Sequence, residues 1–320
     1  MKNKDDTKNI LIAFSIIIAI IFFIFVANIS PDQETTLLVV HEDEATTDVL
    51  TSKLYAQSFI SSKWLFKSIY SISGIDIQPG GYFIKKGSSL FNMVQALSKK
   101  PDLIWVTAPE GRRKEEIASI LSQEFEWGRE DKLSFIHAHD SGPYQEGVYF
   151  PDTYLVPWNI GGGEMAQRMI DRFNEKLKPY TEKFIEENIK WTTGLKLASI
   201  IQREAASEEE MDLIAGILWN RLLDGMKLQT DATLQYMTGK QDGRWWKPIS
   251  VEDKEIDSPY NTYMYEGVPP TPISNPSLAA IKAVLNPRET DCMYYIHSQR
   301  QIYCSTNYDD HMDKINKYLK

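Results

Sequence analysis

The hydrophobic positions between residues 195 and 205 repeat with the period of an α-helix. Leu197, Ile200, Ile201, Glu204 and Ala205 fall at i, i+3, i+4, i+7 and i+8, which is the spacing of one apolar helix face. Glu204 therefore stands where leucine or isoleucine is expected. A carboxylate on such a face is costly unless a partner or a reaction uses it. Two interpretations stay open from this helix alone: an acid paired with an arginine, or a functional acid.

The same periodicity predicts a mainly helical region around this stretch. Helices are expected at 164–177, 181–190, 207–225 and 232–238 and before Leu285, followed by a hairpin at 293–305 and a short C-terminal helix. Ser207 and Glu210 have the spacing of a capping box, and Asp231 is placed to cap the helix at 232–238. Asn275 and Pro276 are expected as N-cap and first residue of the helix that ends at Leu285.

The region before residue 125 shows a different, mixed pattern. Strand-like runs at 37–40, 82–84 and 103–106 are each followed by a tight turn and a short amphipathic helix. Together with the helical C-terminal region they predict an α+β chain. A plain α+β domain that only presents the C-terminal helical region remains the alternative to a binding module.

The first residues contain the longest uncharged apolar run. Residues 10–27 are interrupted only by Ser15 and, as a helix, span about 27 Å, close to the thickness of a bilayer core. This run predicts a transmembrane helix at 10–28, with a cleaved signal peptide as the alternative. Lysines precede the run and acidic residues follow it, with no lysine or arginine before Lys53. The positive-inside rule then predicts a cytoplasmic tail at 1–9, a linker at 29–36 and everything later outside the cytoplasm.

Composition narrows the possible functions. The chain has 320 residues, 42% of them hydrophobic, and a net charge of −9, which indicates real hydrophobic cores and argues against nucleic acid as a partner. His137, His139 and Asp140 lie close together but lack further ligands at metal-binding spacing, so neither a metal nor a cofactor is predicted. Cys292 and Cys304 could face each other across the terminal hairpin. Whether they form a disulfide stays open, because the register of the hairpin is uncertain.

Two segments without periodicity complete the pattern. Residues 146–154 are an ordered, aromatic connection punctuated by Gly147 and Pro151, and residues 258–276 are a proline-stiffened loop. Residues 241–257, which include Trp245 and Trp246, look like an insertion or flap of unknown role. The stiff loop is expected to form a polar wall beside the helix that carries Glu204.

These motifs, in this order, resemble the endolytic murein transglycosylases of the MltG (YceG-like) family. The most specific matches are Ser258-Pro259-Tyr260-Asn261-Thr262-Tyr263, Pro272-Ile273-Ser274-Asn275-Pro276 and the 146–154 connection. The resemblance implies a membrane anchor, a module similar to LysM with its connection at 37–158, and a catalytic domain at 159–320. It also implies peptidoglycan as substrate and the cytoplasmic membrane as location, and it suggests wall-synthesis complexes as partners.

The resemblance makes Glu204 the catalytic residue. Glu204 would protonate the leaving oxygen of a MurNAc–GlcNAc β-1,4 bond and then accept the proton of the C6 hydroxyl, leaving a 1,6-anhydro-MurNAc end. An apolar surrounding raises the proton affinity of a carboxylate in the direction that this role needs. Many relatives have two acids around this position, whereas this chain has Gln202. The alternatives are a muramidase that uses Asp231 or a loop acid as second carboxylate, and a non-catalytic peptidoglycan-binding scaffold.

Other polar and aromatic residues of the matching motifs are candidates for binding sugar groups. Each of them could instead make an internal hydrogen bond or a packing contact, and Arg221 could pair with Asp231 or meet the acidic substrate. The predicted substrate-binding residues are Asn220, Arg221, Gln229, Asp231, Thr233, Gln235, Tyr236, Ser258, Tyr260, Asn261, Thr262, Tyr263 and Asn275.

Overall fold

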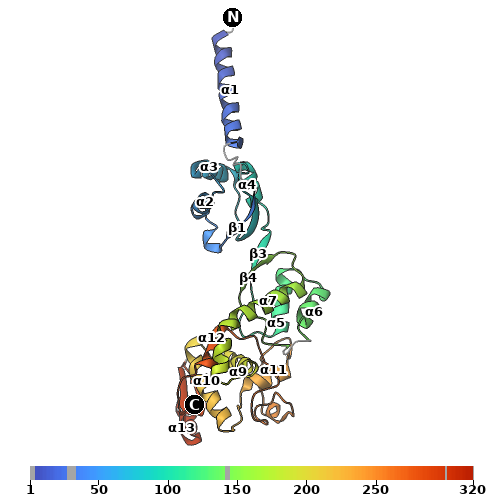
Figure 1. Ribbon diagram of the computed structural model, residues 1–320, viewed down its shortest axis with the longest axis vertical. Coiled ribbons are helices and arrows are strands. Elements are labelled where there is room, and N and C mark those ends of the chain that lie inside the picture. Colours follow the sequence, from blue (N-terminus) through green and yellow to red (C-terminus); the bar gives the residue numbers. More distant parts are fainter. Residues whose placement is uncertain (1–3, 27–33, 141–144, 300, 320) are drawn as a thin grey trace. The chain divides into compact units, whose positions relative to one another are not determined.

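The structure is a computed structural model that describes residues 4–26, 34–140, 145–299 and 301–319 (Figure 1). The chain forms two compact units. The first contains residues 1–106 and 154–159, and the second contains residues 107–153 and 160–320. Helices and two β-sheets occur together, so the predicted α+β class is confirmed.

The first unit is built on a four-stranded sheet. Strands β1 (Thr35–Val40), β2 (Gly80–Lys85), β3 (Leu103–Thr107) and β4 (Thr153–Pro157) lie side by side in that order. β1 and β2 are antiparallel, with Leu38 opposite Tyr82, and β2 is antiparallel to β3. Between β1 and β2 the chain forms η1 (Glu42–Glu44), α2 (Thr47–Ala56) and α3 (Lys63–Ser73), and α4 (Leu90–Leu97) follows β2. Side chains from these elements, such as Leu38, Leu54, Phe66 and Met93, make one buried core.

The three strand–turn–helix runs seen in the sequence are not three separate repeats. Their strands share one sheet, and α5 (Lys114–Glu124), the helix after the third strand, belongs to the second unit. The fourth strand, β4, comes from the end of the 146–154 connection, which lacks the alternation that would have identified a strand.

Helix α1 (Lys4–Val26) corrects the prediction for the N-terminus. Within the residues that the structure describes, no helix combines the length and the apolar character that a membrane crossing requires. On this finding the predicted transmembrane helix at 10–28 is wrong. A span needs roughly 20 apolar residues, and α1 begins with the charged residues Lys4, Asp5, Asp6 and Lys8, which shorten its apolar part. Most of the linker predicted at 29–36 lies outside the described residues.

The second unit is mainly helical. Its helices are α5, α6 (Arg129–His137), α7 (Gly162–Leu177), η2 (Lys178–Tyr180), α8 (Thr181–Glu186), α9 (Trp191–Glu204), α10 (Glu208–Leu223), α11 (Asp231–Thr238), η3 (Glu252–Glu255), α12 (Leu278–Leu285) and α13 (Tyr308–Tyr318). α9 packs against α10, α11 and α12 (Figure 1). Leu197, Ile200 and Ile201 of α9 are fully buried, as the apolar periodicity predicts.

Two helix starts differ from the sequence prediction. α9 begins at Trp191, four residues before the expected start. The N-cap of α12 is Ser277, whose hydroxyl accepts the Ala280 N–H, and it replaces the predicted cap Asn275. Asn275 does not cap this helix because its side chain forms hydrogen bonds with other segments of the second unit.

The Asn275 side chain joins three segments of the second unit. Its amide nitrogen donates to the Arg112 carbonyl at 3.0 Å and to Glu146 Oε1 at 2.6 Å, and its amide oxygen accepts the Tyr149 N–H at 2.9 Å. The Lys114 N–H at the start of α5 also donates to Glu146. Glu146 is 1% exposed, and burial raises the pKa of its carboxyl to about 8. We call this set of contacts the Asn275 junction.

A hairpin near the C-terminus completes the second unit. β5 (Tyr294–Ser298) and β6 (Gln301–Ser305) are antiparallel, with Tyr295 opposite Cys304. A disulfide joins Cys292 to Cys304. The pairing that the sequence left open is therefore formed, and it ties the start of β5 to β6.

Gly147 gives a direct test of the packing at the Asn275 junction. Its φ of +87° favours glycine, and an added Cβ would lie 2.7 Å from the Pro272 side chain. Gly267 has a similar φ of +81° but has open space where a Cβ would be. Gly147→Ala should therefore destabilise the protein by about 1–3 kcal/mol more than Gly267→Ala, because only the first adds a steric clash to the backbone strain. Urea unfolding measures the difference, and equal losses would contradict the described packing.

Candidate active site

Glu204 is the last residue of α9, and two donors from other elements hold its carboxylate. The Tyr295 hydroxyl of β5 donates to Oε2 at 2.8 Å. The Ala232 N–H, in the first turn of α11, also donates to the carboxylate. These contacts bring together three elements that are far apart in the sequence, so the site is defined by tertiary packing.

The surroundings of Glu204 raise its pKa. Burial is the largest cause, and the negative charge of Asp231 acts in the same direction. The position at the C-terminal end of α9 also disfavours a negative charge. The hydrogen bonds from Tyr295 and Ala232 and the nearby His297 act in the opposite direction, because they stabilise the carboxylate. Glu204 can therefore hold a proton at higher pH than an ordinary glutamate and still be stabilised after losing it.

Polar residues surround the Glu204 carboxyl. Asp231 Oδ1 accepts a hydrogen bond of 2.5 Å from the Tyr263 hydroxyl. Arg221 is buried near Glu204, and its guanidinium donates to the carbonyls of Met293 and Leu228. Arg221 thus links the start of the hairpin to the loop before α11 by hydrogen bonds. Among the described residues it makes no ion pair with Asp231, and its hydrogen bonds go to these carbonyls.

Three consecutive side chains at the end of α9 contact three different parts of the unit. Gln202 Oε1 accepts the Ser277 N–H at 2.9 Å, so the N-cap of α12, directly after the 258–276 loop, is held against the helix. The Arg203 guanidinium lies 4.0 Å above the Trp246 ring of the 241–257 segment. Glu204 binds Tyr295 of the hairpin. The last turn of α9 is therefore fixed from three sides.

Several predicted binding residues are internal. Asn261 and Asn275 are fully buried, and their amides bond to neighbouring backbone and to Glu146. Thr233 and Thr262 are buried and bond to each other at 2.9 Å. These side chains shape the loop and the start of α11, and none has its polar atoms directed at an open surface.

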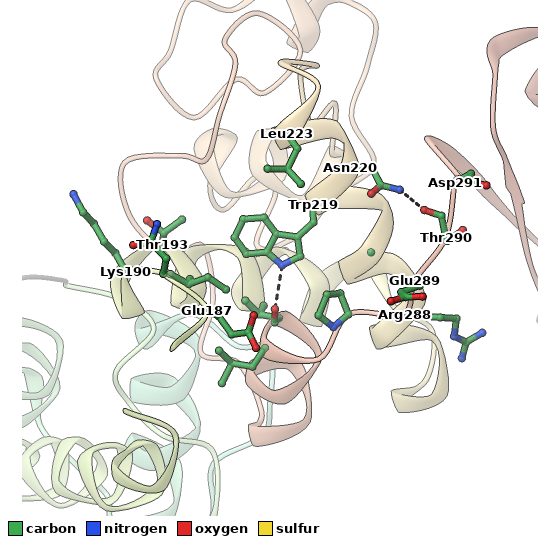
Figure 2. Close-up of a pocket in the computed structure, with 16 residues that line it drawn as sticks. Glu187, Lys190, Thr193, Trp219, Asn220, Leu223, Arg288, Glu289, Thr290 and Asp291 are labelled. Atoms are coloured by element: carbon green, nitrogen blue, oxygen red, sulfur yellow. Dashed lines mark hydrogen bonds between the residues drawn. The ribbon is translucent and has the colours of Figure 1, made fainter. Parts of the chain in front are cut away.

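Asn220 lies away from Glu204. Its amide nitrogen donates to the carbonyls of Thr290 and Cys292. It lines a cavity of about 1010 Å³ that is bordered by Trp219, Thr193 and Lys190, and the Trp219 indole N–H donates to Val284 O there (Figure 2). None of the residues that line this cavity contacts Glu204 through a described hydrogen bond.

The remaining predicted residues keep exposed or partly exposed surfaces. Gln229 is exposed and has a φ of +49°. The Tyr236 ring packs 5.2 Å from that of Tyr260, whose hydroxyl bonds to Thr271. Gln235 is partly exposed, and the Ser258 hydroxyl accepts the Tyr260 N–H.

The sequence did not single out Tyr295 or His297. Both lie on β5, which was recognised only as part of a hairpin, and His297 bonds to Glu210 at 3.0 Å. A period-2 strand pattern shows which residues share a face but not which helix that face meets, so no signal in the sequence connected Tyr295 to Glu204.

Among the described residues, no group of three or more histidine, cysteine, aspartate or glutamate side chains is arranged to hold a metal ion.

Comparison with known proteins identifies the family. A model of the YceG-like family matches residues 38–317. The endolytic murein transglycosylase of Bacillus subtilis (strain 168) is 27% identical, over 91% of this chain and 87% of that protein. The endolytic murein transglycosylase of Streptococcus pneumoniae (strain D39) is 28% identical over 76% of this chain, which spans about half of that longer relative, 51%.

A solved structure supports the fold. The 2.6 Å crystal structure of a putative YceG-like protein from Listeria monocytogenes superimposes with a TM-score of 0.59 at 21% identity, covering 88% of this chain and 99% of that one. This similarity shows a shared fold. Because the family model matches nearly the whole sequence, the chain belongs to the YceG-like family.

Proposed function

We propose that this chain is an endolytic peptidoglycan lytic transglycosylase in which Glu204 acts first as acid and then as base. Family membership and the names of the relatives from Bacillus subtilis and Streptococcus pneumoniae support the enzyme class. The role of Glu204 rests on one observation: its partly exposed carboxyl has a raised pKa and receives hydrogen bonds from Tyr295 and Ala232.

In the first step, protonated Glu204 gives its proton to the oxygen that leaves C1 of MurNAc. The C1–O bond breaks, and the new hydroxyl stays on the GlcNAc product. Burial favours the neutral form of the carboxyl before this step, and a general acid works best when its pKa is near the working pH.

In the second step, the Glu204 carboxylate accepts the proton of the MurNAc C6 hydroxyl, whose oxygen forms a bond to C1. Glu204 is then protonated again, no water is consumed, and the product ends in 1,6-anhydro-MurNAc. Tyr295 and Ala232 stabilise the carboxylate between the two steps, because they are fixed donors that need no reorganisation.

A hydrolase would need a second carboxylate or an activated water. Asp231 is the nearby candidate, but its Oδ1 already accepts the Tyr263 hydroxyl. In the proposed mechanism Asp231 acts through its charge, which raises the pKa of Glu204. The substrate supplies the nucleophile.

The proposed binding surface is smaller than the sequence prediction. It keeps Gln229, Asp231, Gln235, Tyr236, Ser258, Tyr260 and Tyr263, whose side chains retain exposed or partly exposed surface. Ring faces of Tyr236 and Tyr260 offer packing for sugars, whereas Gln229 and Gln235 offer amide groups. The fully bonded Asn220, Arg221, Thr233, Asn261, Thr262 and Asn275 are assigned to building the site.

The first unit is proposed to hold a glycan strand in the manner of a LysM-like module. Two antiparallel strands with two helices between them, together with exposed Trp64 and Phe83, support this role. We place the catalytic unit outside the cytoplasm, where peptidoglycan is found and where a disulfide such as Cys292–Cys304 persists. Wall-synthesis complexes are the proposed partners.

Glu204→Gln tests the proposed catalytic role. The amide cannot donate or accept the proton in this cycle, so turnover of purified glycan strands should fall by at least about a hundredfold. Mass spectrometry of wild-type products should show ends that lack the mass of one water. Glu186→Gln, on the exposed end of α8, is the matched control and should cleave normally. Full activity of Glu204→Gln would refute the assignment, and products that have gained a water would indicate a muramidase.

Tyr295→Phe tests how the hydrogen bond from Tyr295 affects the pKa of Glu204. The reaction needs protonated Glu204, so the rate should fall as pH rises through the raised pKa of Glu204. Tyr295 lowers that pKa by its hydrogen bond, so its removal should move the alkaline limb of the pH–rate profile to higher pH and reduce the maximal rate about tenfold. Tyr303→Phe changes an exposed hydroxyl of the same hairpin and should leave the profile in place. A downward or absent shift in Tyr295→Phe would contradict the arrangement.

A further inference from the structure

Arg203 directly precedes Glu204 and differs from the arginines around it. Its guanidinium stacks at 4.0 Å on the Trp246 ring, and its Nε is buried without a hydrogen-bond partner. No hydrogen bond or ion pair joins this guanidinium to any residue that the structure describes. The side chain is only partly buried, so a ligand can still reach it.

Glu116, the acid that attracts Arg203 most strongly, already makes hydrogen bonds with other groups. Its Oε1 accepts Arg112 at 2.9 Å, and its Oε2 accepts the Trp246 indole N–H at 2.7 Å and the Arg113 N–H at 3.1 Å. Burial and the neighbouring Arg112 lower the pKa of Arg203, so its positive charge is held in an unfavourable surrounding. A half-buried cation that makes no hydrogen bond or ion pair with a described residue is the complement of an anionic ligand.

Two other arginines of the second unit show the usual kind of partner. Arg113 pairs with Glu115 and donates to the Tyr236 carbonyl, and Arg288 forms a bidentate pair with Asp212. A purely structural stacking role for Arg203 would predict similar partners for its polar atoms. Their absence among the described residues separates Arg203 from this group.

The backbone around Arg203 also has features that suit a binding site. Trp246 has a φ of +57°, which is strained for a large side chain and is kept where the surroundings demand it. Gly111, with a φ of +68°, approaches the Arg203 side chain, and a Cβ there would lie 3.7 Å from Nη1. Trp245 stacks with Arg113 beside this position, so two tryptophans of the 241–257 segment border it.

We propose that Arg203, backed by Trp246, forms a subsite for a carboxylate of the glycan strand next to the scissile bond. The inference rests on the proposed function, because it takes peptidoglycan as the ligand. A muramoyl residue carries a lactyl carboxylate, or, when a peptide is attached there, the carboxylates of that peptide. The planar fork of arginine binds either by two parallel hydrogen bonds, whereas the stacked indole fixes its plane.

Such a subsite would also offset the charge repulsion between the protein and its substrate. The chain has a net charge of −9 and would repel an acidic polymer at long range. An unpaired cation one residue from the catalytic acid would favour the acidic sugar on the side of Glu204 that the reaction requires. It would thereby help to select the MurNAc–GlcNAc bond over the alternating GlcNAc–MurNAc bond.

Binding measurements in the full-length Glu204→Gln protein test this subsite without depending on turnover. Three tetrasaccharides of alternating GlcNAc and MurNAc serve as probes: one with free lactyl carboxylates, one with lactyl carboxamides, and one with attached peptides that end in carboxylates. Adding Arg203→Met should weaken binding of the carboxylate probes about tenfold and change carboxamide binding less than twofold. Loss confined to the peptide probe would identify the peptide as the source of the carboxylate, and loss confined to the free-lactyl probe would identify the lactyl group.

Two further variants serve as controls. Arg129→Met removes the same charge from an exposed position in α6 and should not change binding. Arg203→Lys keeps the charge and the fold but loses the fork, so it should weaken carboxylate binding by a smaller factor and leave the carboxamide unchanged. Equal effects of Arg203→Met on all three probes, no effect on any of them, or the same effect from Arg129→Met would overturn the proposal. If Arg203→Met does not fold, Arg203→Lys becomes the test. Unchanged carboxylate binding by Arg203→Lys would then overturn the proposal.

Discussion

The Asn275 junction is the constraint on which the placement of Glu204 depends. The Asn275 side chain donates hydrogen bonds to the Arg112 carbonyl and to Glu146. The residues around it in the chain then form hydrogen bonds with successive positions of α9. The Ile273 N–H donates to Ser199 Oγ, the Ser274 hydroxyl donates to the Ser199 carbonyl, and the Ser277 N–H donates to Gln202. A few buried hydrogen bonds therefore link the start of α5 to the last turn of α9, and a buried polar network of this kind specifies one arrangement when all its members are satisfied.

Interactions of opposite sign act on the Glu204 carboxyl group. Burial, the end of the helix dipole and Asp231 favour the protonated form, whereas Tyr295, Ala232 and His297 favour the carboxylate. The proposed mechanism needs an acid and then a base at the same group, which requires that neither form be too stable. The Glu204 surroundings meet this requirement with side chains and backbone from α9, α11 and β5.

The sequence predicted local structure well where periodicity was strong and poorly where the answer lay in tertiary contacts. The α9 face of Leu197, Ile200 and Ile201 is buried as expected, because helical spacing alone decides it. The role of Asn275 was misjudged, since an Asn-Pro pair before a helix has the same local pattern as a cap whether or not its side chain is used elsewhere. Tyr295 was missed because its link to Glu204 joins residues 91 positions apart.

The connectivity of the two units has a consequence for synthesis on the ribosome. The chain leaves the first unit after residue 106, returns for residues 154–159 and leaves again, so neither unit is a continuous segment. Since domains generally fold as units while the chain emerges, the first unit lacks β4 until residue 157 is made. Glu146 stays without Asn275 for longer still. The nascent second unit must therefore wait for its last third before the contacts around Glu146 and Glu204 can form.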